Sequence, residues 1–181
     1  MSRVARRWWS LAAGVLVAAL AGGIAWLVWP AGKPVYDPPA HTRQYIAFTA
    51  CLLTGPAGLA DPQARAVWSG MQGASSATNA QVNYLSVPTG EADTVGVATP
   101  LANSLVEQRC DVILAVGATE VATVQAVAAQ HAAKRFVLVG GGSPAANIAV
   151  LPQAGVSSVA SRVQSVLQEA VAGDFRSGVV S

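Results

Sequence analysis

The most informative stretch of the chain is the apolar run VILAV at 112–116, which contains no polar residue. A strand that is apolar at every position is buried on both faces, as in a parallel sheet between two layers of helices. Similar short segments at 44–51, 81–87, 136–139 and 147–151 alternate with helix-like segments. This alternation is typical of βαβ units. The pattern predicts an α/β domain with a doubly wound, mostly parallel sheet of about five strands, centred on 112–116.

The segments between these strands contain start and stop signals of helices. Asp61 followed by Pro62 is a typical helix start, and apolar residues recur after it on one side, Trp68 among them. We expect Trp68 to pack on the sheet rather than to stack on a ligand. Further helices are expected from Thr99-Pro100 to 108, from 119 to about 135, and over 157–171.

The first 44 residues contain a candidate membrane anchor. Arg3, Arg6 and Arg7 precede a stretch at 8–29 that has no charge and has tryptophans near both ends. A helix of this length spans about 30 Å, the thickness of the hydrocarbon core of a bilayer. Basic residues stay on the cytoplasmic side. A cleavable signal peptide is the alternative, although its apolar core usually has only about 7–15 residues.

This segment gives the expected organisation and location of the chain. We expect a cytoplasmic basic segment at 1–7 and a single-pass anchor at 8–29 in a bacterial cell membrane. A proline-rich tether at 30–44 would then lead to an extracytoplasmic domain at 45–181. The expected partners are the membrane, through 8–29, and a small-molecule ligand, with a second copy or another protein as alternatives.

Charge excludes one class of partner. Charged residues make up 11% of the chain, and the net charge of +2 arises from basic residues before the domain. Residues 45–181 carry six basic and eight acidic side chains. No basic face for nucleic acid is therefore expected.

The chain shows little sign of catalytic chemistry. Its two histidines, His41 and His131, have no metal-ligand spacing with the cysteines, and no nucleophile motif is present. We expect no catalytic residue, no metal ligand and no cofactor. An enzyme on this sheet is the least favoured of the functions considered.

The two cysteines are predicted to be buried free thiols. An exported domain would meet an oxidising compartment, where disulfides form. However, Cys51 is expected at the carboxyl end of the first strand and Cys110 at the amino end of a parallel one. The length of a strand would then keep their Cα atoms farther apart than the limit of about 7 Å for a disulfide.

The predicted binding residues follow from the topology. In open α/β sheets ligands bind at the carboxyl ends of the strands, and small residues there leave room. The loops at 51–61, 117–119 and 140–143 should meet at this edge. The candidate ligand-binding residues, all in or beside these loops, are Cys51, Leu52, Thr54, Gly55, Asp61, Gly117, Ala118, Gly140 and Gly141.

Several segments, in this order, resemble the substrate-binding proteins of the basic-membrane-protein family, which are similar to purine nucleoside receptors of ABC importers. They are YIAFTA at 45–50, AVWSG at 66–70, RCDVILAVG at 109–117, RFVLV at 135–139 and NI at 147–148. The resemblance implies a type I periplasmic-binding-protein lobe with strand order 2-1-3-4-5 and a nucleoside-type ligand. The chain has one such lobe, and Ala50-Cys51 stands where the family has an acidic residue.

Two functions therefore remain open besides the disfavoured enzyme. The first is an anchored, extracytoplasmic solute-binding-like domain. The second is a non-catalytic interaction or self-association module that uses the same lobe as a scaffold, because the cleft face of a single lobe would be exposed.

Overall fold

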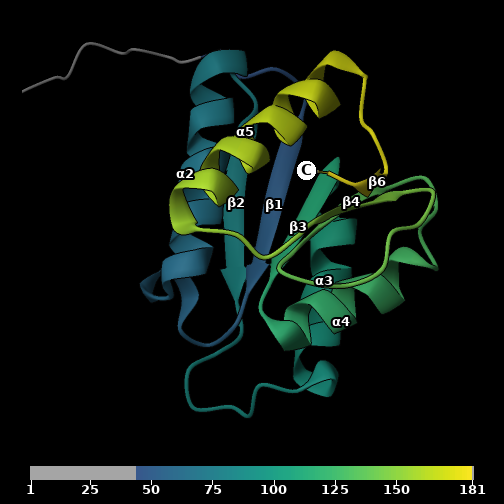
Figure 1. Cartoon of the computed structure of the whole chain (residues 1–181). Coiled ribbons are helices and arrows are strands. Elements are labelled where there is room, and N and C mark those ends of the chain that lie inside the picture. Colours follow the sequence, from purple (N-terminus) through teal and green to yellow (C-terminus); the bar gives the residue numbers. More distant parts are fainter. Residues whose placement is uncertain (1–43, 181) are drawn as a thin grey trace, which may run out of the picture. The chain divides into compact units, whose positions relative to one another are not determined.

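The sheet has six parallel strands in the order β2-β1-β3-β4-β5-β6, in a computed structural model that describes residues 44–180 (Figure 1). The strands are β1 (Thr49–Thr54), β2 (Gln81–Ser86), β3 (Val112–Val116), β4 (Arg135–Val139), β5 (Ile148–Leu151) and β6 (Gly178–Val179). The predicted order of the first five strands is confirmed, with β3 between β1 and β4. The sixth strand, which has only two residues, was not predicted.

Helices cover both faces of this sheet. They are α2 (Pro62–Thr78), α3 (Val95–Glu107), α4 (Ala118–Ala128) and α5 (Val156–Ala172), with a short 3-10 helix η1 (Gly58–Ala60) before α2. Helices α2 and α5 pack together on one face, and α3 and α4 pack together on the other (Figure 1). The predicted α/β architecture with helices on both faces is therefore confirmed.

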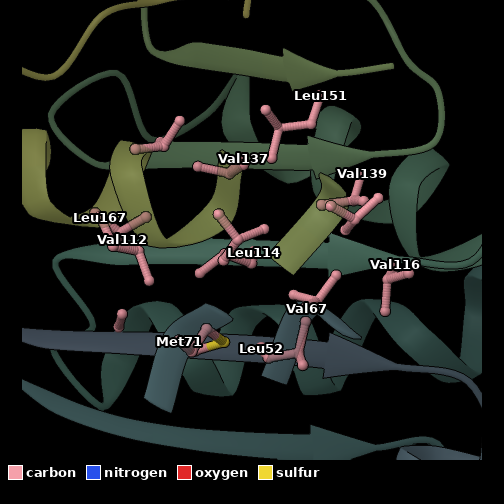
Figure 2. Close-up of a cluster of buried hydrophobic side chains, with 14 of the residues drawn as sticks. Leu52, Val67, Met71, Val112, Leu114, Val116, Val137, Val139, Leu151 and Leu167 are labelled. Carbon is pink, nitrogen blue, oxygen red and sulfur yellow. The ribbon is translucent and has the colours of Figure 1, made fainter. Parts of the chain in front are cut away.

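The core lies on both sides of the central strands. On the face of α2 and α5, Leu52, Leu114 and Val137 occupy the same level of three neighbouring strands and are fully buried. Figure 2 shows them with Met71 of α2. On the opposite face, Phe136 is equally buried between the sheet and the other helix pair. Burial on both faces explains why β3 is apolar throughout.

Of two helix starts predicted from the sequence, that of α2 is confirmed and that of α3 is not. Asp61 caps α2 as predicted, because its side chain accepts a hydrogen bond of 2.8 Å from the backbone N–H of Ala64. Helix α3, in contrast, begins five residues before Pro100, with Thr94 as its cap. Pro100 lies inside this helix, where it removes one backbone hydrogen bond without ending the helix. Helix α4 is shorter than predicted and ends at Ala128.

The prediction of free cysteines is wrong, because Cys51 and Cys110 form a disulfide with their Cα atoms 5.9 Å apart. The error lies in the bounds of the first strand. Strand β1 begins at Thr49, so Cys51 is its third residue and lies beside Ile113 of β3. Cys110 comes just before β3 and is buried on the same face as Cys51. The two cysteines therefore lie near the same end of neighbouring strands.

The membrane prediction concerns another part of the chain. Among the helices of residues 44–180, none is long and apolar enough to cross a bilayer. The proposed anchor at 8–29 and the tether before Gln44 lie outside the described residues. They stay predictions.

The contact between α2 and α5 depends on a glycine. A Cβ atom on Gly70 would collide with the backbone oxygen of Ala160 and lie 2.9 Å from the Cβ of Val163. We expect Gly70→Ala to lower the free energy of unfolding by about 1–3 kcal/mol, because the two helices must move apart. Urea denaturation measures this loss.

Gly96→Ala in α3 is a matched control for this substitution. The nearest atom to a Cβ on Gly96 lies 3.9 Å away, so the added methyl group causes no clash. This variant should keep its stability or gain slightly from the higher helix propensity of alanine. Equal stability of both variants would contradict the close contact at Gly70.

Candidate functional site

A cavity of about 630 Å³ opens at the carboxyl ends of β3 and β4. Its walls come from the start of α2, most of the length of α4, the glycines after β4 and the segment before α5. The lining residues are Gln63, Gly117, Ala118, Val121, Ala122, Gln125, Ala126, Val139, Gly140, Gly141, Gly142 and Gln153. A smaller hollow of about 170 Å³ adjoins it at the end of β1 and shares Gln63 and Gly117 with it. Both lie where ligands bind in open α/β sheets.

Six of the nine predicted binding residues border these two spaces. Gly117, Ala118, Gly140 and Gly141 line the cavity, and Gly55 and Asp61 line the hollow together with Gly117. They come from three separate loops, which the parallel sheet brings to one edge. Asp61 is also the cap of α2, so its carboxylate is already engaged.

The other three predicted residues lie inside the domain. Cys51 and Leu52 are fully buried in β1, and Cys51 is bonded to Cys110. Thr54 ends β1 and is 1% exposed, and its Oγ1 has no hydrogen-bond partner within the described residues. These three residues line neither space.

Three glutamines of the cavity were not predicted. Gln63 belongs to the first turn of α2, Gln125 to α4, and Gln153 to the segment before α5. Isolated glutamines are common on protein surfaces, so no single one attracts attention in the sequence. Their convergence depends on the packing of α2 and α4 on opposite faces of the sheet.

A buried acid, Glu120, lies next to Gly55 and Gly117 at this edge of the sheet. Glu120 belongs to the first turn of α4 and is 1% exposed. Its Oε1 lies 3.4 Å from the position that a Cβ of Gly55 would take, and a Cβ on Gly117 would collide with Oε2. Gly117 also has a φ of +110°, which favours glycine. The carboxyl group therefore fills space that the two glycines leave free.

The surroundings of Glu120 favour its protonated form. Neither carboxyl oxygen has a hydrogen-bond partner among residues 44–180, and the Asp93 carboxylate is close by. Burial is the main cause that raises the pKa of Glu120 to about 7, and the charge of the nearby Asp93 adds to it. The sequence analysis did not single out this residue, although an acid directly after the loop of the central strand could have drawn attention to it.

Trp68 is a packing residue, as predicted. Its half-buried ring makes an edge-to-face contact with Tyr84 of β2, with ring centroids 5.3 Å apart. It packs against the core on the side of α2 and does not line the cavity. In the part of the chain that the structure covers, no group of three or more histidine, cysteine or acidic side chains could hold a metal ion.

Comparisons with known proteins agree on the architecture. No family model and no curated protein matches the sequence. A crystal structure of a fragment that is provisionally described as a lipoprotein, from Peptoclostridium difficile 630, is 15% identical, with a TM-score of 0.55 over 70% of this chain and 98% of that chain. At this level of identity the similarity shows a shared fold and no more.

Two further structures are more distant. A solute-binding protein of an ABC transporter system from Aeropyrum pernix K1 is 16% identical, with a TM-score of 0.49 over 58% of this chain and 28% of that chain. A transcriptional activator of the comK gene from Bacillus halodurans is 18% identical, with a TM-score of 0.44 over 57% of this chain and 34% of that chain. The described domain thus matches about a third or less of the length of each. The comparison with the lipoprotein fragment shows a shared fold, and the comparisons assign no family.

Proposed function

We propose that the domain is a solute-binding-like module that holds a small molecule at the carboxyl edge of its sheet. The observation that carries the proposal is the cavity of about 630 Å³, which four of the predicted residues line. Ligand sites typically have volumes of about 300–1,000 Å³ and occur at this edge of open α/β sheets. Binding is favoured over catalysis because the cavity is lined by glutamine, glycine, alanine and valine.

The proposed location is extracytoplasmic. The Cys51–Cys110 disulfide supports it, because disulfides persist in oxidising compartments and are rare in the cytoplasm. An anchor at 8–29 would hold the domain at the membrane. The sequence resemblance to binding components of ABC importers adds a nucleoside-type ligand to this proposal.

A screen of metabolites with the purified full-length chain tests the proposal. A ligand at 100 times its Kd adds about 2.7 kcal/mol to stability, which corresponds to a rise in Tm of about 5–10 °C for a domain of this size. We expect Ala122→Leu to abolish this rise. Ala122 is an exposed cavity-lining residue of α4, so a leucine there occupies the cavity and keeps the helix.

Ala172→Leu is the matched control, because Ala172 is an exposed helical residue at the end of α5, away from the cavity. It should respond to the ligand as the wild type does. If no metabolite raises the Tm, or if Ala122→Leu responds fully, the cavity is not the binding site. Concentration-dependent light scattering would then test the second function, self-association of the lobe.

A further inference from the structure

The cavity presents polar groups that carry no charge. Within the part of the chain that the structure describes, its polar side chains are Gln63, Gln125 and Gln153, and no charged or aromatic side chain lines it. Carboxamides both donate and accept hydrogen bonds. The cavity is therefore suited to a ligand that offers both kinds of group.

The three carboxamides lie around the glycine turn after β4. A Cβ on Gly140 would lie 3.1 Å from Nε2 of Gln63 and 3.5 Å from Oε1 of Gln153. A Cβ on Gly142 would lie 2.9 Å from Oε1 of Gln125. The glycines thus leave the space in which these side chains approach the backbone.

The hydrogen bonds of these side chains differ. Oε1 of Gln125 accepts a hydrogen bond of 2.9 Å from the backbone N–H of Ser143, which fixes this side chain to the turn. Nε2 of Gln63 is buried and has no hydrogen-bond partner among residues 44–180. A buried donor without an acceptor is rare in native proteins. An oxygen atom of a ligand would satisfy it.

The charges around the cavity disfavour an anion. The amino ends of α2 and α4 reach the cavity, and the amino end of a helix attracts negative groups. The amino end of α2 already has an acid of its own, because the Asp61 side chain caps this helix. An anionic ligand would find no cation among the lining residues to balance its charge. A charged group buried without a partner is costly.

We propose that the cavity takes an uncharged ligand with hydroxyl or carboxamide oxygens, and that Gln63 donates a hydrogen bond from Nε2 to one of these oxygens. The inference rests on the proposed function and narrows it to a class of ligand. It makes Gln63 a residue that determines specificity. A stacked aromatic ring is not required, since no aromatic side chain from residues 44–180 lines the cavity.

Isothermal titration of the full-length chain with matched pairs of compounds tests the ligand class. The pairs are N-acetylglucosamine with glucosamine, ribose with ribose 5-phosphate, and adenosine with adenosine monophosphate. The members of each pair differ in one charged group. We expect an uncharged member to bind and its charged counterpart to bind at least about tenfold more weakly.

The outcomes separate the two proposals. Tighter binding of the charged member overturns the ligand class and leaves the binding function standing. If none of these compounds binds but the metabolite screen yields a ligand, charged and uncharged analogues of that ligand are titrated instead. Tighter binding of the charged analogue would again overturn the proposed ligand class. If neither experiment yields a ligand, both proposals fail.

A substitution at Gln63 tests the proposed hydrogen bond. Gln63→Leu keeps a side chain of similar size and removes the donor, so it should weaken binding of the uncharged ligand by about tenfold. Gln72→Leu is the control, because Gln72 is an exposed residue of the same helix and does not line the cavity. Binding by Gln63→Leu with the affinity of the wild type would overturn the role of Gln63.

Discussion

The double variant Cys51→Ala/Cys110→Ala is expected to lose about 4 kcal/mol of its free energy of unfolding. The disulfide links two residues that are 59 positions apart, and a cross-link over a loop of this length restricts the unfolded chain by about that amount. Both cysteines are fully buried, so the folded protein should resist reducing agents that act on exposed disulfides. Urea denaturation without reductant measures the difference between the variant and the wild type.

Wild-type protein that is unfolded and refolded under reducing conditions provides the control. It lacks the same cross-link but keeps both side chains, so its loss of stability should be close to that of the double variant. A difference below about 1 kcal/mol between the oxidised wild type and the variant would contradict the expected effect. Mass spectrometry of the oxidised protein should also yield the linked peptides of Cys51 and Cys110.

Glu120→Gln is expected to stabilise the domain by roughly 1–3 kcal/mol at pH 8 and to have little effect at pH 4. The pKa of Glu120 rises from 4.5 to about 7 on folding, so the folded state keeps a proton that the unfolded state has lost between these pH values. The contribution of Glu120 to stability is complete below about pH 4.5, falls as the pH rises to about 7, and stays at the lower value above that. One pKa unit corresponds to about 1.4 kcal/mol. Glutamine resembles the protonated acid and removes this loss.

Denaturation curves between pH 4 and pH 8 check this expectation. The variant should gain on the wild type as the pH rises, because Asp93 and burial no longer act against a charge at position 120. Glu107→Gln is the control, since Glu107 is exposed at the end of α3 and should give no such divergence. Parallel pH profiles of Glu120→Gln and the wild type would show that Glu120 does not retain its proton on folding.

The main features of the fold were predictable because a strand that is buried on both faces is apolar at every position. Strand β3 is covered on both faces, and its five apolar residues have no other simple explanation. The start of β1 was misplaced because Tyr45 and Ile46 have strand propensity, yet they are 50% and 38% exposed and lie before the sheet. That error of a few residues also led to the wrong prediction for the cysteines.

The candidate site was predictable only as far as backbone topology determines it. The glycines of the loops after β3 and β4 were found because parallel strands bring their carboxyl ends to one edge. The glutamines were missed because polar, uncharged side chains carry no signal of their convergence. Glu120 was missed because its unusual pKa depends on burial and on Asp93, which is 27 positions away in the sequence and becomes its neighbour only on folding.

The short strand β6 has a consequence for how the chain avoids aggregation. It lies along β5, and the backbone N–H of Val180 donates a hydrogen bond of 2.9 Å to the oxygen of Val150. Strand β5 is apolar and fully buried, so its free backbone groups would form a template for a strand of another molecule if β6 detached. The opposite edge strand, β2, exposes the polar residues Gln81 and Asn83 and also Tyr84. The two residues of β6 thus cover the part of β5 that would otherwise be open to pairing with another molecule.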